Sequence, residues 1–314
     1  VVDHFFLTST HNWLLFFTNK GRVYRIKAYE LPEGSRDSKG QHVANLLQFA
    51  PDETIQTVLS IPNYEVARYL VLATRSGKVK KTPLAEYDSP RQGGLIAVRL
   101  MADENGENAD ELIGAALCNA QDDIILVSRL GMSLKFQADD EQLRPMGRQT
   151  AGVQGMKFRA DDSLLAMDVV PSDSDKDLFV VTNEGFAKRT AIGEYRLQGR
   201  NGLGVKAVQL VEGRGALVGA LVVSEDDQVM AIMKSGKVIR SNVDEVKRTG
   251  RNTQGVTFAK PDKGDMILSI ARNEEKDEPE EDGGTAANGA GDTAANGAGE
   301  TVQSDKNVNN PDEA

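Results

Sequence analysis

The sequence predicts an all-β protein in which similar units of about four short strands are arranged around an axis. A turn that ends in glycine recurs at intervals of 56, 54, 54 and 51 residues. Each turn separates two strand-like runs and is followed by an acid and then by a loop containing arginine and glycine. A period of this length is typical of stacked or radial repeats, and a closed ring leaves few exposed strand edges. The turn glycines are Gly21, Gly77, Gly131, Gly185 and Gly236.

The two runs beside each turn have different patterns. The first run is almost continuously apolar, as in YLVLA (69–73) and QVMAIM (228–233), which predicts a strand buried on both faces near the centre of the assembly. The glycine that closes the turn suits the left-handed position of a bulged hairpin loop. The second run alternates, so its basic side chains are expected to face water while their neighbours pack.

After the second run, each unit carries an arginine three or four residues before the last glycine of a loop, which we call the Arg-Gly loop. A short strand such as GVKAVQL (204–210) and a last apolar strand follow. Residues 1–12 resemble the end of such a unit, so five full units and the end of a sixth are expected. The full units are predicted at 13–68, 69–122, 123–176, 177–226 and 227–273, and the loop arginines are Arg36, Arg91, Arg148, Arg200 and Arg251.

The end of the chain has a different composition. Residues 274–314 hold 12 Asp and Glu but only 2 Lys and Arg, whereas residues 1–273 hold 35 of each, so the net charge of −10 belongs to this tail. The tail contains a duplicated GTAANGAG-like segment (284–299) and almost no large apolar residue. It is predicted to be disordered, because it cannot bury enough apolar surface to offset its ordering entropy.

Basic residues gather after the hairpin glycine and around the Arg-Gly loop. In a radial repeat these positions fall on one rim, and a belt of positive charge can hold a bent polyanion. Ordinary protection of exposed strand edges is the alternative explanation for the hairpin lysines. Besides the loop arginines, the candidate contacts are Arg22, Lys39, Lys78, Lys80, Lys81, Lys188, Arg189, Lys206, Lys237, Arg240 and Arg248, and the belt also includes Arg144, Arg196 and Lys247.

The remaining residues argue against chemistry at a pocket. Cys118 lies in an apolar run and is expected in the core, and the three histidines lack metal-ligand spacing. No Walker-type loop, nucleophile elbow, secretory signal or membrane span is recognisable. No cofactor or catalytic residue is therefore predicted for this chain, and a cytoplasmic location is expected.

Several phrases resemble the carboxyl-terminal domain of DNA gyrase A in its actinobacterial form. They are LLFFTNKGRVYRIKAYELPE (14–33), YLVLATRSGKVKKTPL (69–84) and LRPMGRQTAGVQGM (143–156), and the resemblance covers residues 1 to about 273. It implies a six-bladed β-pinwheel, a relative of the propeller in which blades exchange strands. The heptapeptide QGRNGLG (198–204) is similar to the family's QRRGGKG box, keeping Gln198, Arg200, Gly202 and Gly204 but carrying Leu203 in place of the lysine.

The resemblance implies a non-catalytic module that bends and wraps duplex DNA around a basic outer rim with a fixed hand, using the box residues and the belt. In the family this wrapping enables negative supercoiling by a topoisomerase whose ATP and Mg²⁺ are used elsewhere. The implied partners are double-stranded DNA, the rest of the gyrase A protein, and the gyrase B protein, and the isolated domain is expected to be a monomer associated with the nucleoid. The acidic tail is a candidate competitor for DNA on the rim or, equally, a solubilising extension.

Two rival interpretations remain open. One is the matching C-terminal domain of topoisomerase IV. The other is a propeller that serves as a protein-interaction scaffold or a hydrolase, which would require a polar funnel at the ring axis with converging carboxylates or histidines.

Overall fold

The computed structural model describes residues 4, 6–35, 37–91, 93–102, 104–106, 110–159 and 161–273. These residues belong to one compact unit, 1–276, and residues 277–314 form a second unit. Arg36 and the predicted acidic tail (274–314) lie outside the described residues.

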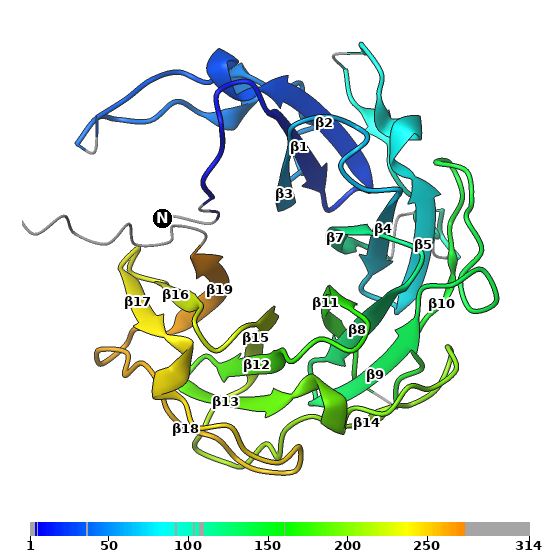
Figure 1. Ribbon diagram of the computed structural model, residues 1–314. Helices are drawn as coiled ribbons and strands as arrows, with labels where there is room; N and C mark the ends of the chain where they lie inside the picture. The colour runs from blue at the N-terminus through cyan, green and yellow to red at the C-terminus, as the bar shows by residue number, and fades with distance from the viewer. Residues whose placement is uncertain are drawn as a thin grey trace, which may run out of the picture. The chain divides into compact units, whose positions relative to one another are not determined.

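The described residues form five antiparallel sheets, which follow one another around an axis (Figure 1). The sheets have the strand orders β3-β1-β2-β6, β10-β5-β4-β7, β11-β8-β9-β14, β15-β12-β13-β18 and β17-β16-β19. The strands are β1 (Trp13–Thr18), β2 (Arg22–Lys27), β3 (Ile55–Ile61), β4 (Tyr69–Thr74), β5 (Lys78–Pro83), β6 (Leu95–Ile96), β7 (Leu112–Cys118), β8 (Asp122–Ser128), β9 (Met132–Gln137), β10 (Val153–Gln154), β11 (Leu164–Pro171), β12 (Asp177–Thr182), β13 (Phe186–Ala191), β14 (Val205–Lys206), β15 (Leu217–Val223), β16 (Gln228–Met233), β17 (Val238–Asn242), β18 (Val256–Thr257) and β19 (Ile267–Asn273).

Short 3₁₀ turns follow the second strand of most units, as in η1 (Ala28–Glu30) and η3 (Leu84–Tyr87). The others are η2 (Val43–Asn45), η4 (Ile192–Glu194) and η5 (Val243–Glu245). Among the described residues, no helix is both long enough and apolar enough to cross a membrane.

The all-β propeller prediction is confirmed, but the prediction of six blades is wrong, because the described residues form five. Residues 1–12 were expected to form the end of another blade, and the part of this range that the structure describes, residues 4 and 6–12, contains no strand. They instead lie beside β3, where the Thr8 hydroxyl is 2.7 Å from that of Ser60 and His4 Nε2 is 3.1 Å from the Ile55 carbonyl oxygen. The last strand of each described blade pairs with the first strand of its own unit, as β3 pairs with β1, and among the described residues no such first strand is available to residues 6–12.

The blades exchange strands, as the family resemblance implied. The outer strand of each complete blade comes from the following unit: β6 pairs with β2, β10 with β5, β14 with β9, and β18 with β13. In the last blade, β17 has no outer partner strand among the described residues, and Val238 at its start is 40% exposed. Each complete blade therefore takes its outer strand from a segment about 70 residues beyond its own second strand.

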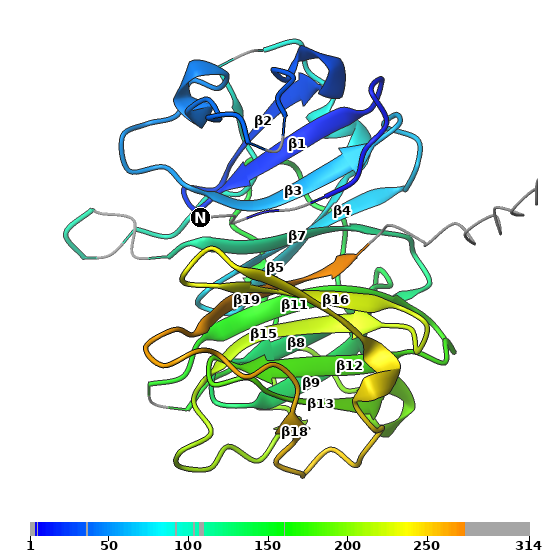
Figure 2. The same ribbon diagram turned by 90° about the vertical axis from the view of Figure 1, so that its left-hand side faces the viewer.

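The core lies between neighbouring blades, which explains why the first strand of each unit is apolar along its whole length. In β1, Leu15 and Phe17 pack toward the second blade, while Leu14 and Phe16 pack on the opposite face. The expected burial is confirmed, but the strands closest to the axis are the last strands of the units. Figures 1 and 2 show these inner strands side by side, with β7 between β3 and β11 and with β15 between β11 and β19.

The hairpin prediction is also confirmed. All five turn glycines have positive φ, from +72° at Gly21 to +87° at Gly185 and Gly236. At Gly185 a side chain is excluded by packing as well, since a Cβ would lie 1.5 Å from the Ala259 carbonyl oxygen. The turn is thus the point where the chain returning from the outer strand crosses the hairpin of the preceding unit.

Candidate nucleic-acid interface

In each four-stranded blade, the outer edge is covered by one stretch of the following unit, which we call the edge segment. Three edge segments have the same construction: 143–154 on β5, 195–206 on β9 and 246–257 on β13. Each first makes a parallel bridge to the strand, as in Lys81 to Pro145 or Lys135 to Leu197. It then forms the Arg-Gly loop and ends in the outer strand. The loop is therefore held at both ends on the preceding blade.

The hairpin cations were expected to face water, and for four of the candidate contacts this is wrong. Lys80 and Lys81 are fully buried, and Lys188 and Arg189 are 1% and 4% exposed. The edge segment covers the edge that the alternating pattern had assigned to solvent. These four side chains therefore do not belong to the surface belt.

Lys80 and Lys188 hold the Arg-Gly loops from beneath. The Lys188 ammonium donates to the carbonyl oxygens of Ala207 (2.7 Å), Gly250 (2.8 Å) and Arg251. Lys80 donates to Ala97 and Arg148 in the same way. Burial lowers the pKa of Lys80 to about 7 and that of Lys188 to about 8. The two lysines thus satisfy loop carbonyls that the fold has removed from water.

Lys81 makes its polar contacts with the next unit, whereas both acid partners of Arg189 lie in its own unit. Lys81 Nζ donates to the carbonyl of Ala138 (2.6 Å) and to the Asp140 carboxylate (3.0 Å). Arg189 pairs with Asp177 (2.8 Å), which is itself buried, and with Glu225 (2.9 Å). The positive charges of Lys81 and Arg189 are therefore paired with acidic side chains of the protein itself.

The loop arginines form a clamp between successive outer strands. The guanidinium of Arg148 donates to the Ile96 carbonyl at the end of β6 (2.7 Å). Arg200 donates to the carbonyl of Gln154 at the end of β10 (2.7 Å) and to that of Gln142. Arg251 does the same to Lys206 at the end of β14 (3.1 Å). The repeated arginine that identified the loops in the sequence therefore has a structural role in three units.

The last glycine of the loop also serves packing. At Gly204, φ is +75° and a Cβ would lie 2.2 Å from the Ser133 carbonyl oxygen of β9. Gly152 stands in the same relation to Val79 of β5. These glycines bring the edge segment against the blade, whereas Gly147 faces open space and a Cβ on Gly199 would meet only the Gln142 Oε1 atom, at 3.9 Å.

Exposed cations lie on both sides of each loop. On one side, Arg144, Arg196 and Lys247 are exposed, and each directly follows a buried anchor (Leu143, Tyr195 or Val246). The anchor faces the core, so the next side chain in the extended segment points away from it. In the second unit this position is Asp88, which pairs with Arg25 (2.7 Å).

On the other side, the structure adds two residues that the sequence prediction missed. The backbone N–H of Arg99 donates to the Thr150 carbonyl of the next loop (3.0 Å), and that of Lys157 donates to Gly202 (2.8 Å). Both side chains are exposed, and each follows the last glycine of its own loop by five residues, a spacing that could have revealed them. Gln209 holds the third equivalent position, with its N–H 2.9 Å from the Thr253 carbonyl.

The other predicted contacts occupy varied environments. Gln198 is half-buried, and its amide oxygen accepts from the Arg196 guanidinium (2.9 Å). Arg22 donates to the Gly93 carbonyl (2.6 Å), and Arg248 pairs with Asp177 (2.8 Å) and Asp175 (3.2 Å), which raise the pKa of Arg248. Lys39, Arg91, Lys206, Lys237 and Arg240 are exposed, whereas Lys78 and Gly202 are half-buried.

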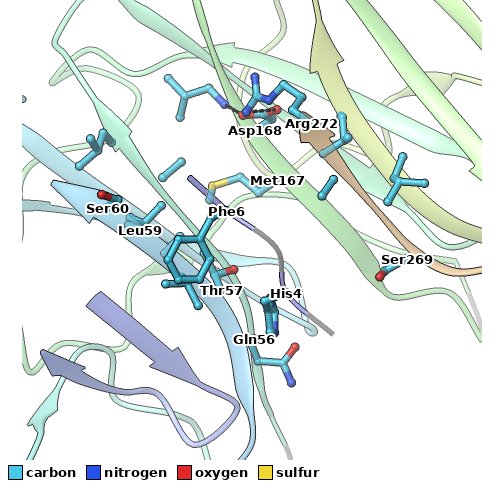
Figure 3. Close-up of a pocket in the computed structure, with 18 of the residues that line it drawn as sticks. His4, Phe6, Gln56, Thr57, Leu59, Ser60, Met167, Asp168, Ser269 and Arg272 are labelled. Atoms are coloured by element: carbon cyan, nitrogen blue, oxygen red, sulfur yellow. Dashed lines mark hydrogen bonds and ion pairs between the residues drawn. The ribbon is translucent and has the colours of Figure 1, made fainter. Parts of the chain in front are cut away.

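A cavity of about 640 Å³ is lined mainly by the inner strands and by His4 and Phe6 (Figure 3). Asp168 lies 3.7 Å from the Arg272 guanidinium and accepts from the Val222 N–H (2.9 Å). His4 Nε2 contacts the Ile55 carbonyl oxygen. Among the residues that the structure describes, no His, Cys, Asp or Glu cluster could hold a metal ion. The carboxylates among the residues that line the cavity are Asp122 and Asp168.

These observations define a class: a strand-exchanged β-propeller whose exposed cations flank the loops on its blade edges. A family model described as "DNA gyrase C-terminal domain, beta-propeller" matches residues 12–62, 68–119, 122–171, 176–224 and 227–274. The chain belongs to this family. Its relatives include the DNA gyrase A protein of Streptomyces coelicolor, 57% identical over 88% of the chain, and that of Mycolicibacterium smegmatis, 53% identical over 90%. In both cases the match spans 32% of the relative, so the chain corresponds to about a third of these proteins.

Two solved structures are similar at TM-score 0.72 and 25% identity. One is a DNA gyrase A C-terminal domain, with 84% of this chain and 83% of that chain covered. The other is the C-terminal domain of a DNA topoisomerase IV, with 84% and 79% covered. The fold is thus common to both, while the Streptomyces and Mycolicibacterium relatives, both above 50% identity, are gyrases, which favours gyrase over topoisomerase IV.

Proposed function

We propose that this chain is a non-catalytic module that binds duplex DNA along the outer edges of its blades and wraps it with a fixed hand. The observation that carries the proposal is the repeated placement of exposed cations beside the Arg-Gly loops. Three precede the loops (Arg144, Arg196, Lys247), and Arg99 and Lys157 lie on their other side. None of the five is required by the core.

The chemistry of these groups fits phosphate. Lys and Arg side chains displace condensed counterions from DNA and contact phosphates without reading sequence. A smooth bend of a short duplex costs up to about 6 kcal/mol, so several phosphate contacts must act together. Equivalent positions on successive blades supply such contacts along a curved path. Rigidity of the loops, which the buried lysines and loop arginines provide, keeps the cations in place before DNA binds.

In the whole protein this module would act with the remainder of gyrase A and with gyrase B. Wrapping would present one DNA segment to the machinery that passes strands, where ATP and Mg²⁺ are used. The chain itself would need no cofactor, and DNA as its ligand implies a location at the nucleoid in the cytoplasm.

The proposal is tested by measuring the affinity of the 314-residue chain for a duplex as a function of salt. Five phosphate contacts predict that log affinity falls with log salt at a slope of about −4.5, from −0.9 for each contact. An affinity that is independent of salt would overturn DNA binding by this surface.

A second measurement tests the wrap. Closed circular DNA is relaxed by a type I topoisomerase in the presence of the chain, and the linking number is read after the protein is removed. A shift of one sign that grows with protein concentration is expected. Binding without any shift would refute wrapping with a fixed hand and would leave a DNA-binding domain only.

A further inference from the structure

The Arg-Gly loop of residues 198–204 differs from the others at its apex. The residue before the last glycine is Lys39, Gly93, Ala151, Leu203 or Gln254 in the five units, so only this loop carries a large apolar side chain there. Leu203 is 41% exposed, and Leu197 beside it is 56% exposed. The two leucines line one shallow hollow of about 410 Å³ together with Arg196 and Gln198. This is an apolar surface within a region otherwise marked by charge.

The loop is held rigidly in this position. The N–H of Asn201 donates to the Gly155 carbonyl (2.7 Å), and Arg200 is fixed to Gln142 and Gln154. Asn201 has φ +65°, a left-handed conformation that a non-glycine residue adopts rarely. Beneath the loop lies Leu134, in the place where Lys80 and Lys188 stand in other blades, and a Cβ on Gly202 would lie 3.2 Å from its Cδ1. Because the loop backbone is already held in place, little conformational entropy is lost when Leu203 contacts a ligand.

Exposed cations surround the apolar surface. Arg196 lines the same hollow, Lys157 is attached to the loop through the Gly202 carbonyl (2.8 Å), and Lys206 follows in β14. A ligand that satisfies both features must offer anionic groups on either side of an apolar one. The major groove of DNA has this arrangement, because phosphates border it and the C5 methyl group of thymine projects into it.

We infer that Leu203, supported by Leu197, is a base-edge contact that enters the major groove of the bound duplex and packs against a thymine methyl group. The inference rests on the proposed function and adds to it a point of sequence preference. The cations bind phosphates, which are the same in every DNA sequence. The leucine increases the affinity for a duplex that has a thymine at one position of the wrapped segment. This loop thereby sets where on a DNA molecule the wrap is centred.

The test compares two duplexes of one sequence, one with thymine and one with uracil, which lacks only the C5 methyl group. The 314-residue chain should bind the thymine duplex about fourfold more tightly, the ratio expected from burial of one methyl group. Leu203→Ala should bind both duplexes equally. Lys157→Ala is the matched control: it should weaken binding to both duplexes while keeping the ratio. Gln254→Leu, which places a leucine in the next loop, should raise the ratio further.

The outcomes separate this inference from the proposed function. A chain that binds neither duplex in a salt-dependent manner refutes the proposed function. Salt-dependent binding with a ratio of 1 for the unsubstituted chain refutes only the thymine contact. A ratio of about 4 that persists in Leu203→Ala also refutes it, because the preference would then come from the stiffness of the two duplexes.

Discussion

Two sets of basic residues lie in similar sequence surroundings, but one set is buried and the other is exposed to solvent. Lys188 and Arg189 follow a hairpin glycine in an alternating strand, yet they lie in the interior. Arg196 and Lys247 stand before an Arg-Gly loop, next to buried residues, yet they are exposed. The difference arises because the next unit covers the hairpin strand, while the covering segment itself has an outer side. Charge in a repeat therefore cannot be assigned to the surface before the partner of each strand is known.

The largest effect is expected for Asp177→Ala, which tests whether the buried cations stabilise the fold. Asp177 is fully buried, and its removal leaves the Arg189 guanidinium inside with a lost partner. A loss of about 3–5 kcal/mol in the free energy of unfolding is expected, measured by urea denaturation. Asp52→Ala is the control, since Asp52 is 69% exposed and its partner Lys20 is 31% exposed, and an exposed ion pair contributes little to the free energy of unfolding. Equal losses would contradict the distinction.

The exposed half is tested by the triple variant Arg144→Ala, Arg196→Ala and Lys247→Ala. The salt slope of DNA binding should become shallower by about 2.7, or 0.9 for each phosphate contact removed. The urea midpoint should not move, because the three side chains are exposed. An unchanged slope would show that these cations do not contact phosphates.

The loop arginines share features with both sets. The variant Arg200→Ala shows whether Arg200 stabilises the fold, as the buried cations do, or contacts phosphate, as the exposed cations are proposed to do. As a clamp on the carbonyls of Gln142 and Gln154, Arg200 should contribute about 1.5–3 kcal/mol to stability, the value for hydrogen bonds from charged groups. Urea denaturation measures this loss, and the salt slope should stay the same. A variant with full stability and a slope shallower by about 0.9 would instead identify a phosphate contact.

The smallest expected effect is a dependence of stability on pH. Lys80 and Lys188 have pKa values of about 7 and about 8 in the fold, against 10.5 for an ordinary exposed lysine. Between pH 7 and 9 the unfolded chain holds more protons, so stability should rise with pH. The rise should not exceed about 1.4 kcal/mol per pH unit for each lysine, the energy that corresponds to one pKa unit. In Lys80→Met/Lys188→Met this rise should disappear; if it remains, other groups are responsible.

The repeat, the strands and the hairpin turns could be predicted from the sequence because they depend on local chemistry. Gly21 and its equivalents need positive φ, and the apolar first strands need burial on both faces. The number of blades could not be predicted by counting units, since residues 6–12 resemble a last strand in sequence but contain no strand in the structure and lie beside β3 instead.

The candidate site could be predicted only in part. The Arg-Gly loops were located correctly as a repeated element, but the roles of Arg148 and Arg251 depend on carbonyl groups about 50 residues away. The burial of Lys80 depends on an edge segment from another unit. Arg99 and Lys157 lack any local motif and become prominent only when the spacing from the loop glycine is compared between units. Long-range pairing, which the local pattern does not encode, accounts for these differences.

The exchange of outer strands has a consequence for cooperativity. A blade with all its strands from one unit could open alone, but here β5 loses its cover whenever 153–154 leave it, and these residues belong to the unit that begins at β8. Local opening in one unit therefore weakens the unit before it, and because the strand pairing is mutual, opening of that earlier unit weakens the later one by the same amount. The free energies of neighbouring units are thereby coupled, and the position of a destabilising change along the chain, besides its size, determines how much of the protein responds.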